Sequence, residues 1–312
     1  MTRYLELDGG IVPRPPYLQK NTFLTAWVLR SDKGAQQALL DQTLNDPAGG
    51  AVDYRALTGH AIMTLADIKS ISSLDPVHAG YGQSSEVDIV FWTPVGAYKD
   101  GVLDRLMFFC PYIWVTNGYA MAAGREVYGF PKSIAWANLP ASPDDPGPLW
   151  AEAMVMPRYA PESVLSRERV FMLSRPPAPA GPTFGAGDAV AAVTRLIDEL
   201  IAAGVEISRE ILATFLGDLF AFRLPIVFLK QFRSASSSTE ACYQGIIEAN
   251  TTVTEFRSAG LLPPGWTMEI PRYDSLRLGE TLGLGARQSV DLGFWIDYSF
   301  SADLGREVWR AT

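Results

Sequence analysis

Several residue types on which protein chemistry often depends are scarce in this sequence. The 312 residues include 2 cysteines and 2 histidines. Cys110 and Cys242 lie far apart and form no C-x-x-C spacing, so a disulfide framework is not expected. His60 and His78 are not grouped with other metal-ligating residues, as a zinc site would require. We therefore predict that the protein uses no metal and no other cofactor.

Long runs of basic or of apolar residues are also absent. The net charge is -8, and no cluster of lysine and arginine is placed to follow a phosphate backbone or an anionic bilayer. No stretch reaches the roughly 18 apolar residues of a membrane span, and residues 1–6 do not begin an apolar leader. We predict a cytoplasmic protein that binds neither nucleic acid nor membranes.

The sequence does contain many short apolar runs separated by turn residues. Hydrophobic residues make up 48% of the chain, and these runs alternate with polar residues or are rich in β-branched and aromatic types, as strands are. The predicted strands are residues 22–29, 59–71, 86–92, 106–115, 149–156, 225–232, 243–253 and 290–300. Residues 35–44 are predicted to form a helix. The pattern indicates an α+β fold that is mostly β, built as an antiparallel β-barrel or sheet.

The character of the sequence changes near residue 186. Between Asp188 and Phe222 apolar residues recur at helical spacing, with Asp188 and Ser208 as N-caps and Gly204 between the two stretches. We predict a helical hairpin inserted at about residues 186–222. Neither half of the chain holds a complete pattern of its own, so residues 1–312 are expected to form a single domain.

Two familiar motifs are incomplete. Residues 185–190 begin like a dinucleotide-binding loop, but the third glycine is missing and prolines precede the loop where a buried strand is required. Residues 82–86 lack the last glycine of the G-x-S-x-G turn of serine hydrolases. Neither nucleotide binding nor Ser/His hydrolysis is therefore predicted.

Lysine is scarce as well, and Lys132 has unusual neighbours. It follows Pro131, whose ring stiffens the backbone, and it lies close to Tyr128, Phe130 and Ile134. A lysine attacks a ketone only as the free amine, and at a reference pKa of about 10.4 roughly one in a few thousand is neutral at pH 7. Burial or a neighbouring cation can lower that pKa to about 7, at a cost on the order of 4.6 kcal/mol. The ordinary alternative is a side chain that extends past the aromatic residues to solvent.

The segment from Gly124 to Lys132, Gly-Arg-Glu-Val-Tyr-Gly-Phe-Pro-Lys, resembles the sequence around the Schiff-base lysine of acetoacetate decarboxylase and its relatives. Residues 12–17, 226–248 and 289–300 extend the resemblance, whereas residues from about 157 to 223 are interpreted as largely an insertion. The resemblance implies the family's fold, a homo-oligomer, and a lysine that forms an imine with a carbonyl substrate.

The sequence departs from the true decarboxylases of this family at positions that carry charge. Those enzymes place a second lysine after the reactive one, where it lowers the pKa of the first, and here that residue is Ser133. The resemblance aligns Thr22 with the family's arginine and Ala61 with its first glutamate. The second glutamate aligns with Gln83, or with Glu86 after a shift of a few residues. We therefore expect imine chemistry without the groups that handle a β-keto carboxylate.

These observations favour a lyase acting on a small keto acid, by aldolase, dehydratase or hydratase chemistry rather than by acetoacetate decarboxylation. The alternatives are an acetoacetate (β-keto acid) decarboxylase and a non-catalytic barrel that binds a small ligand. The expected catalytic residues are Lys132, Glu86 and Tyr81, the expected substrate-binding residues are Gln83, His60 and Phe130, and Arg125 and Glu126 are expected to support the lysine segment as an ion pair. His60, Tyr81 and Glu86 also have ordinary interpretations, as a hydrogen-bonded strand residue, a core aromatic and a solvated strand end.

Overall fold

A computed structural model describes residues 3–7, 12–185 and 223–312. The helical hairpin predicted between Asp188 and Phe222 lies outside the described residues. In chain order the described elements are β1 (Tyr17–Arg30), α1 (Lys33–Leu40), η1 (Asp41–Asn45), β2 (Tyr54–Ala56), β3 (His60–Ser73), β4 (Ser84–Lys99), β5 (Val102–Val115), α2 (Gly118–Ala123), η2 (Gly124–Tyr128), β6 (Lys132–Asn138), β7 (Leu149–Val155), β8 (Ser166–Ser174), β9 (Thr183–Gly185), β10 (Arg223–Arg233), β11 (Ala241–Leu261), β12 (Thr267–Glu269), α5 (Leu278–Leu282), β13 (Arg287–Ala302) and β14 (Arg306–Arg310).

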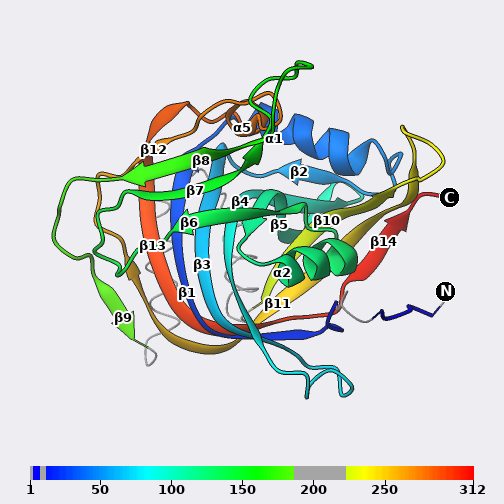
Figure 1. The fold of residues 1–312 in the computed structure, drawn as a ribbon, viewed down its shortest axis with the longest axis horizontal. Helices are drawn as coiled ribbons and strands as arrows, with labels where there is room; N and C mark the ends of the chain where they lie inside the picture. The colour runs from blue at the N-terminus through cyan, green and yellow to red at the C-terminus, as the bar shows by residue number, and fades with distance from the viewer. Residues whose placement is uncertain (1–2, 8–11, 186–222) are drawn as a thin grey trace.

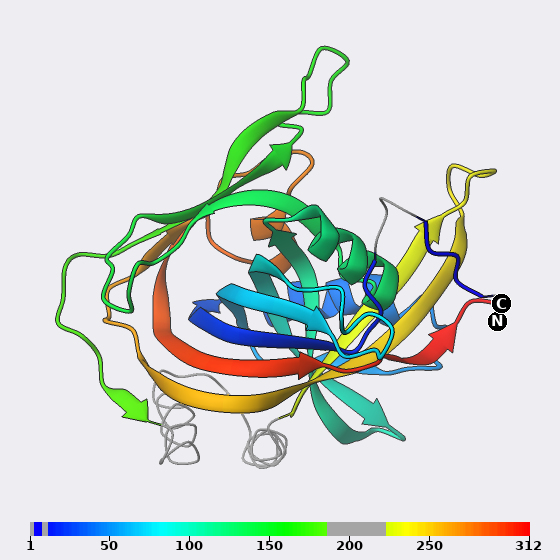
Figure 2. The ribbon, with the colours of Figure 1, turned by 60° about the horizontal axis from the view of Figure 1, so that its bottom comes forward.

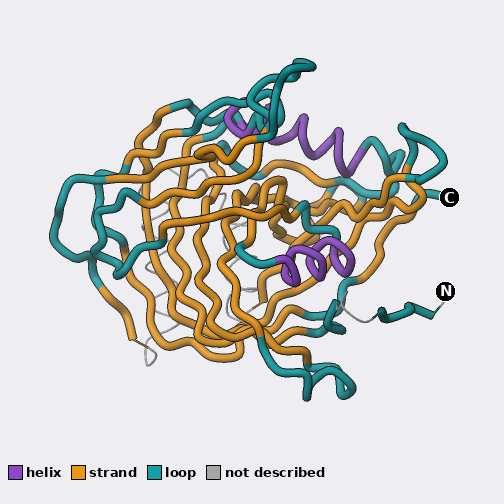
Figure 3. The backbone as a smooth tube through the Cα atoms, viewed as in Figure 1, coloured by secondary structure: helices purple, strands orange, loops and turns teal. Residues whose placement is uncertain are grey.

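Strands dominate the structure, which confirms the expectation of a mostly β fold (Figure 1; Figure 3). Within the described residues the strands form one 14-stranded sheet. Its pairings are antiparallel except where β5 runs parallel to β10 and to β6. The predicted strands correspond to β1, β3, β4, β5, β7, β10, β11 and β13, and the predicted helix corresponds to α1 and η1.

Part of the segment from about residue 157 to 223, interpreted from the sequence as largely an insertion, belongs to the sheet. Residues 166–174 form β8, which pairs with β7 and with β12 and is therefore an integral strand of the sheet. Its start, Ser166-Arg167-Glu168-Arg169, is too polar to resemble a strand in sequence. Tertiary pairing overrides the weak local signal there.

The sheet closes on itself in two circuits that share β1, β3, β4, β5 and β13. In the hollow circuit, β5 is joined to β13 through β10 and β11. In the filled circuit, β5 is joined to β13 through β6, β7, β8 and β12. Figure 2 shows how strongly β11 and β13 curve as they complete the hollow circuit.

The shared strands serve both circuits because successive side chains on a strand point to opposite faces. Along β3, Ala61, Met63 and Leu65 belong to the packed core of the filled circuit. Between them, Ile62 and Thr64 line the cavity of the hollow circuit. The period of two in the sequence thus separates core-forming from cavity-lining side chains on the same strand.

The helices are not part of the sheet but pack against it. Asp32 caps α1 by accepting a hydrogen bond from the N–H of Ala35 at 2.7 Å. Leu40 and Leu44, from α1 and η1, pack with Tyr54 of β2 in a second apolar core. None of the helices in the described residues combines the length and the apolar character of a membrane span.

Candidate active site

The hollow circuit encloses a cavity of about 560 Å³. Strands β1, β3, β4, β10, β11 and β13 all contribute side chains to its wall, as do α2 and η2. Lys132, Glu86 and Asp88 carry the charges of the described lining, apart from His78, whose charge depends on protonation. Within the described residues, no arginine and no second lysine lines the cavity.

Local backbone structure brings Lys132 into the cavity. The helix α2 widens into the π-helical turn η2, in which the N–H of Gly129 bonds to the carbonyl of Gly124, and Gly129 ends the turn in a left-handed conformation with φ of 96°, which favours glycine. A Cβ on Gly129 would lie 2.6 Å from Cα of Lys230, so a larger residue has no room. The chain then starts β6 at Lys132, which pairs with Ile113 of the parallel neighbour β5.

The first glycine of the motif makes room for the lysine side chain. A Cβ on Gly124 would lie 2.5 Å from Cδ and 2.9 Å from Cε of Lys132. The aliphatic stem therefore packs directly on the backbone of η2, and the lysine side chain is only 7% exposed. This packing explains why glycine and lysine stand together in the motif.

Two carboxylates face the amine. Nζ of Lys132 lies 3.4 Å from Oε2 of Glu86 and 3.3 Å from Oδ1 of Asp88. Both acids come from β4, and because they are two residues apart they share its cavity-facing side. Glu86, an expected catalytic residue, lies beside Lys132, and Asp88 is an additional neighbour of the amine that the sequence prediction missed. The alternation of the strand predicted from residue 86 could have found it.

The three groups control one another's protonation. Burial, followed by the neighbouring charge of Asp88, raises the pKa of Glu86 to about 7, although Lys132 opposes the rise. Burial lowers the pKa of Lys132, but Asp88 and Glu86 outweigh it, so that the pKa of the amine is raised. The expectation of a lowered lysine pKa is therefore wrong, because the neighbours are acids and Ser133 is exposed as the next residue on β6.

Arg125 and Glu126, predicted to support the lysine segment together, bind different partners. Nη1 of Arg125 donates a hydrogen bond to the backbone carbonyl of Lys132 at 3.2 Å, which ties η2 to the start of β6. Oε2 of Glu126 instead accepts a hydrogen bond from the hydroxyl of Tyr4 at 2.8 Å. The predicted ion pair between Arg125 and Glu126 is wrong, because each side chain has a different partner.

Two predicted substrate-binding residues line the same cavity as Lys132. The ring of Phe130 lies 5.4 Å from Nζ of Lys132, measured to the ring centroid, and it packs against Phe228. Oε1 of Gln83 accepts a hydrogen bond from the hydroxyl of Ser70 at 2.5 Å. Phe130 therefore contacts the amine, whereas the Gln83 side chain has a protein partner of its own.

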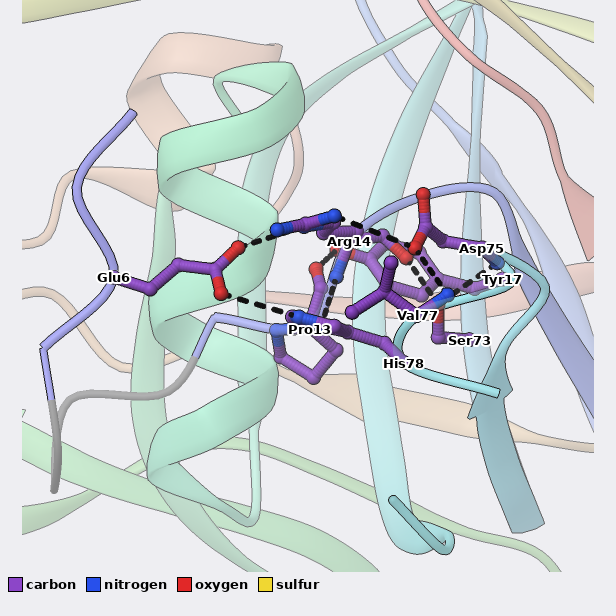
Figure 4. A network of polar contacts seen from close by, with 8 residues as sticks. All are labelled: Glu6, Pro13, Arg14, Tyr17, Ser73, Asp75, Val77 and His78. Carbon is purple, nitrogen blue, oxygen red and sulfur yellow. Dashed lines mark hydrogen bonds and ion pairs between the residues drawn. The ribbon is translucent and has the colours of Figure 1, made fainter. Parts of the chain in front are cut away.

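Tyr81 lies at the exposed edge of the cavity, in the loop between β3 and β4. It is 66% exposed, and its ring stacks on the ring of His78. Nδ1 of His78 accepts a hydrogen bond from the backbone N–H of Arg14, so Nε2 faces Glu6, 3.3 Å away (Figure 4). Arg14 also pairs with Glu6 at 2.7 Å. This network fastens the N-terminal segment to the loop that carries Tyr81, and Tyr81 is thus part of the cavity mouth.

The structure does not bring His60 to the site. Nε2 of His60 lies 3.4 Å from Oδ2 of Asp291, and its side chain does not line the cavity. The positions aligned with the family's charged residues are likewise elsewhere: Thr22 is fully buried outside the lining, and Ala61 belongs to the filled core. The alternation along β3 accounts for Ala61, which faces away from the cavity.

Cation binding has little support in the described part of the chain. Glu86 and Asp88 are engaged with Lys132, and the described residues contain no group of three His, Cys, Asp or Glu side chains placed to hold a metal ion. The chemistry available at this site is therefore that of one amine, two carboxyl groups and an apolar enclosure.

Comparison with known proteins identifies the fold. No family model and no curated protein sequence matches the chain. The structure is similar to that of acetoacetate decarboxylase from Legionella pneumophila, with a TM-score of 0.61 and 14% identity over 99% of this chain and 92% of that one. It is also similar to the enduracididine biosynthesis enzyme MppR complexed with pyruvate, with a TM-score of 0.56 and 15% identity over 97% and 93% of the two chains. An acetoacetate decarboxylase-like enzyme from Sphingomonas wittichii has a TM-score of 0.56 and 14% identity over 98% of both chains. The chain therefore has the fold of acetoacetate decarboxylase and the enzymes like it, as the segment around Lys132 predicts.

Proposed function

We propose that the protein is a lyase in which Lys132 forms an imine with a carbonyl substrate. The observation that carries this proposal is the placement of one buried amine within 3.4 Å of Glu86 and 3.3 Å of Asp88, inside a cavity of about 560 Å³. A nucleophile with adjacent proton-transfer groups in an enclosed, mostly apolar site is the arrangement that imine chemistry needs.

The carboxylate of Glu86 can convert the Lys132 ammonium to the free amine by accepting a proton from it. Its pKa of about 7 means that it can hold or release a proton near neutral pH. In the first step Glu86 takes a proton from the Lys132 ammonium, and the nitrogen lone pair then attacks the carbonyl carbon. Glu86 returns the proton to the carbinolamine oxygen, and water leaves as the protonated imine forms. Asp88, whose Oδ1 lies 3.3 Å from Nζ of Lys132, is placed to stabilise the positive charge of the imine.

The protonated imine draws electrons from a bond of the carbon next to the former carbonyl carbon. In retro-aldol cleavage the bond between that carbon and the one beyond it breaks, Glu86 takes the proton of the hydroxyl on the departing carbon, and a second carbonyl compound leaves as the enamine forms. In dehydration Glu86 takes a proton from the carbon next to the imine, and the resulting enamine expels the hydroxyl of the carbon beyond it as water when Glu86 returns the proton. This supports aldolase, dehydratase or hydratase chemistry. The similar enzyme MppR is described in complexes with pyruvate and with a condensation product of pyruvate and imidazole 4-carboxaldehyde. We propose that this chain catalyses a reaction of that type.

Acetoacetate decarboxylation has less support. A β-keto carboxylate entering the cavity would meet two acids, with no arginine and no second lysine in the described lining to hold it. A non-catalytic binding protein is the second candidate, and the raised pKa of Lys132 favours it, because the resting amine is then charged.

Borohydride trapping tests the proposal directly. The protein is incubated with pyruvate, acetoacetate or butanone, reduced with borohydride and analysed by intact mass and peptide mapping. We expect a single adduct on Lys132 and none in Lys132→Ala. Release of carbon dioxide from acetoacetate, lost in Lys132→Ala, would instead assign the decarboxylase activity.

Lys230→Ala is the matched control. Lys230 is half-buried, and burial lowers its pKa, but its amine contacts the carbonyl of Val127 and does not line the cavity. We expect this variant to label like the wild type. Absence of an adduct with every carbonyl compound, or equal labelling of Lys132→Ala, would contradict the proposal and favour the non-catalytic candidate.

A further inference from the structure

We infer that the cavity takes an uncharged carbonyl compound with a long apolar chain, in place of the small keto acid that the resemblance implies. The carbonyl is placed at Lys132, and the chain extends along β3 and β4 into the far part of the hollow circuit. The assignment of the carbonyl to Lys132 rests on the proposed function, whereas the size and charge of the ligand rest on the cavity itself.

The length of the cavity is the first argument. On β4 both Glu86 and Trp92 line it, and their partners on β3, Ile68 and Ile62, line it too. Six residues of strand correspond to a contour of roughly 20 Å. The cavity thus continues well beyond the level of the charged cluster. Its volume of about 560 Å³ lies in the range that holds drug-sized ligands.

The chemistry of the far part of the cavity is the second argument. Beyond Asp88 on β4 the described lining includes Val90 and Trp92, and beyond Ala66 on β3 it includes Thr64 and Ile62. Phe294 of β13 also lines the cavity and is level with Thr64 through Ala26 of β1. The hydroxyl of Thr64 accepts a hydrogen bond from Nε1 of Trp92 at 3.0 Å, so these polar groups pair with each other. The side chains of Ile62, Val90 and Phe294 offer no hydrogen bonds to a polar ligand, but they favour transfer of hydrocarbon from water. An alkyl or aryl chain is the ligand part that fits this region.

The charge at the near end is the third argument. Lys132 already has two carboxylate neighbours, so its positive charge is fully compensated. A substrate carboxylate placed beside the carbonyl would be a third acid in a buried site, and like charges repel strongly where water is excluded. The site therefore selects against keto acids and in favour of neutral ketones or aldehydes.

Equilibrium binding of methyl ketones tests the length of the ligand. The fluorescence of Trp92, which lines the cavity, provides one readout, and calorimetry provides another. For 2-butanone, 2-octanone and 2-dodecanone at pH 7, we expect the affinity to rise about fourfold or less per added methylene and at least a hundredfold across the series. An affinity that does not change with chain length would overturn the inference.

A matched pair of ligands tests the charge. 2-Oxododecanoate carries the same alkyl chain as 2-dodecanone, with a carboxylate in place of the methyl group beside the carbonyl. We expect the acid to bind at least tenfold more weakly at pH 7. Equal or tighter binding of the acid would overturn the uncharged part of the inference.

Variants at the far end locate the chain. Ile62→Trp shortens the cavity, and we expect it to weaken binding of 2-dodecanone tenfold or more while leaving 2-butanone within about twofold. Ile62→Phe is a second, milder variant with the same expected direction. Val102→Trp is the control, because Val102 is 69% exposed and does not line the cavity. Unchanged binding of 2-dodecanone in both cavity variants would contradict the placement of the chain.

The two proposals fail in different ways. If the long ketones bind reversibly but borohydride traps no adduct, the ligand class stands and the imine chemistry fails. If pyruvate is trapped on Lys132 but long ketones do not bind, the imine chemistry stands and the ligand class fails.

Discussion

The filled and the hollow circuit are built partly from the same strands but use their interiors differently. In the filled circuit, side chains from β7, β8 and α5 converge with those of the shared strands, as Ala151, Phe171 and Leu282 do. In the hollow circuit, β10 and β11 curve around a space of about 560 Å³. An unfilled apolar space forgoes dispersion contacts, so a fold retains one where a ligand will occupy it. The comparison separates the part of the molecule that stabilises the fold from the part that holds the chemistry.

Phe91 and Phe300 allow the sharpest test of this division. Phe91 is fully buried in the filled core and packs edge-on against Trp114 and Phe171. Phe300 lines the cavity and stacks on Tyr298. We expect Phe91→Ala to lower the free energy of unfolding by about 3–5 kcal/mol, and Phe300→Ala to lower it by about 1 kcal/mol, because Phe300 already borders empty space. Urea denaturation measures both, and equal losses would contradict the division.

Replacement of Glu86 is expected to give the next largest effect, a change in how the free energy of unfolding depends on pH. Its pKa is raised in the folded protein from a usual 4.5 to about 7, so the folded state binds this proton more tightly than the unfolded state does. The contribution of the Glu86 proton to the free energy of unfolding is complete below about pH 4.5 and is lost as the pH rises through 7. Relative to Glu86→Gln, the wild type should lose stability between pH 5 and 7 by at most about 1.4 kcal/mol per pH unit.

Denaturant titrations at several pH values check this difference. Glu162→Gln, in an exposed turn, is the control and should follow the wild type. The raised pKa of Lys132 does not disturb the comparison, because that amine stays charged throughout the window. A difference between wild type and Glu86→Gln that stays constant from pH 5 to 7 would show that Glu86 is already ionised in the folded protein.

Sequence patterns predicted the strands well where both faces of a strand are apolar or alternate clearly. Residues 86–92 and 106–115 fall within β4 and β5 because burial on two sides demands hydrophobic side chains there. The sequence patterns did not predict β8, because the residues at its start are polar or charged. They also did not predict that the sheet closes into two circuits, because pairing between distant strands leaves no local signal.

The site was predictable to a similar extent. The motif located Lys132 and its glycines, and Glu86 was among the candidates, whereas Asp88 required the alternation of β4 to be followed two residues further. His60 was placed near the site by alignment alone, but its side chain faces Asp291 instead. The direction of the Lys132 pKa could not be foreseen, because it depends on which carboxylates meet the amine in three dimensions.

Arg125 gives the smallest effect, and it tests how the two circuits are joined. Its side chain, on η2 in the wall of the hollow circuit, donates a hydrogen bond to the carbonyl of Lys132, the first residue of β6, so it ties the cavity wall to a strand of the filled circuit. Loss of one such hydrogen bond costs about 1 kcal/mol, so we expect Arg125→Ala to slow borohydride labelling of Lys132 by about fivefold. The pH at half-maximal labelling should not move, because Arg125 positions the lysine backbone and does not contact the amine. Arg125→Lys should restore part of the rate, and Glu126→Gln, whose side chain meets Tyr4 instead, should label like the wild type. A shifted pH midpoint in Arg125→Ala would mean that Arg125 acts on the protonation of the site, and the two circuits would then be coupled through charge as well as through backbone position.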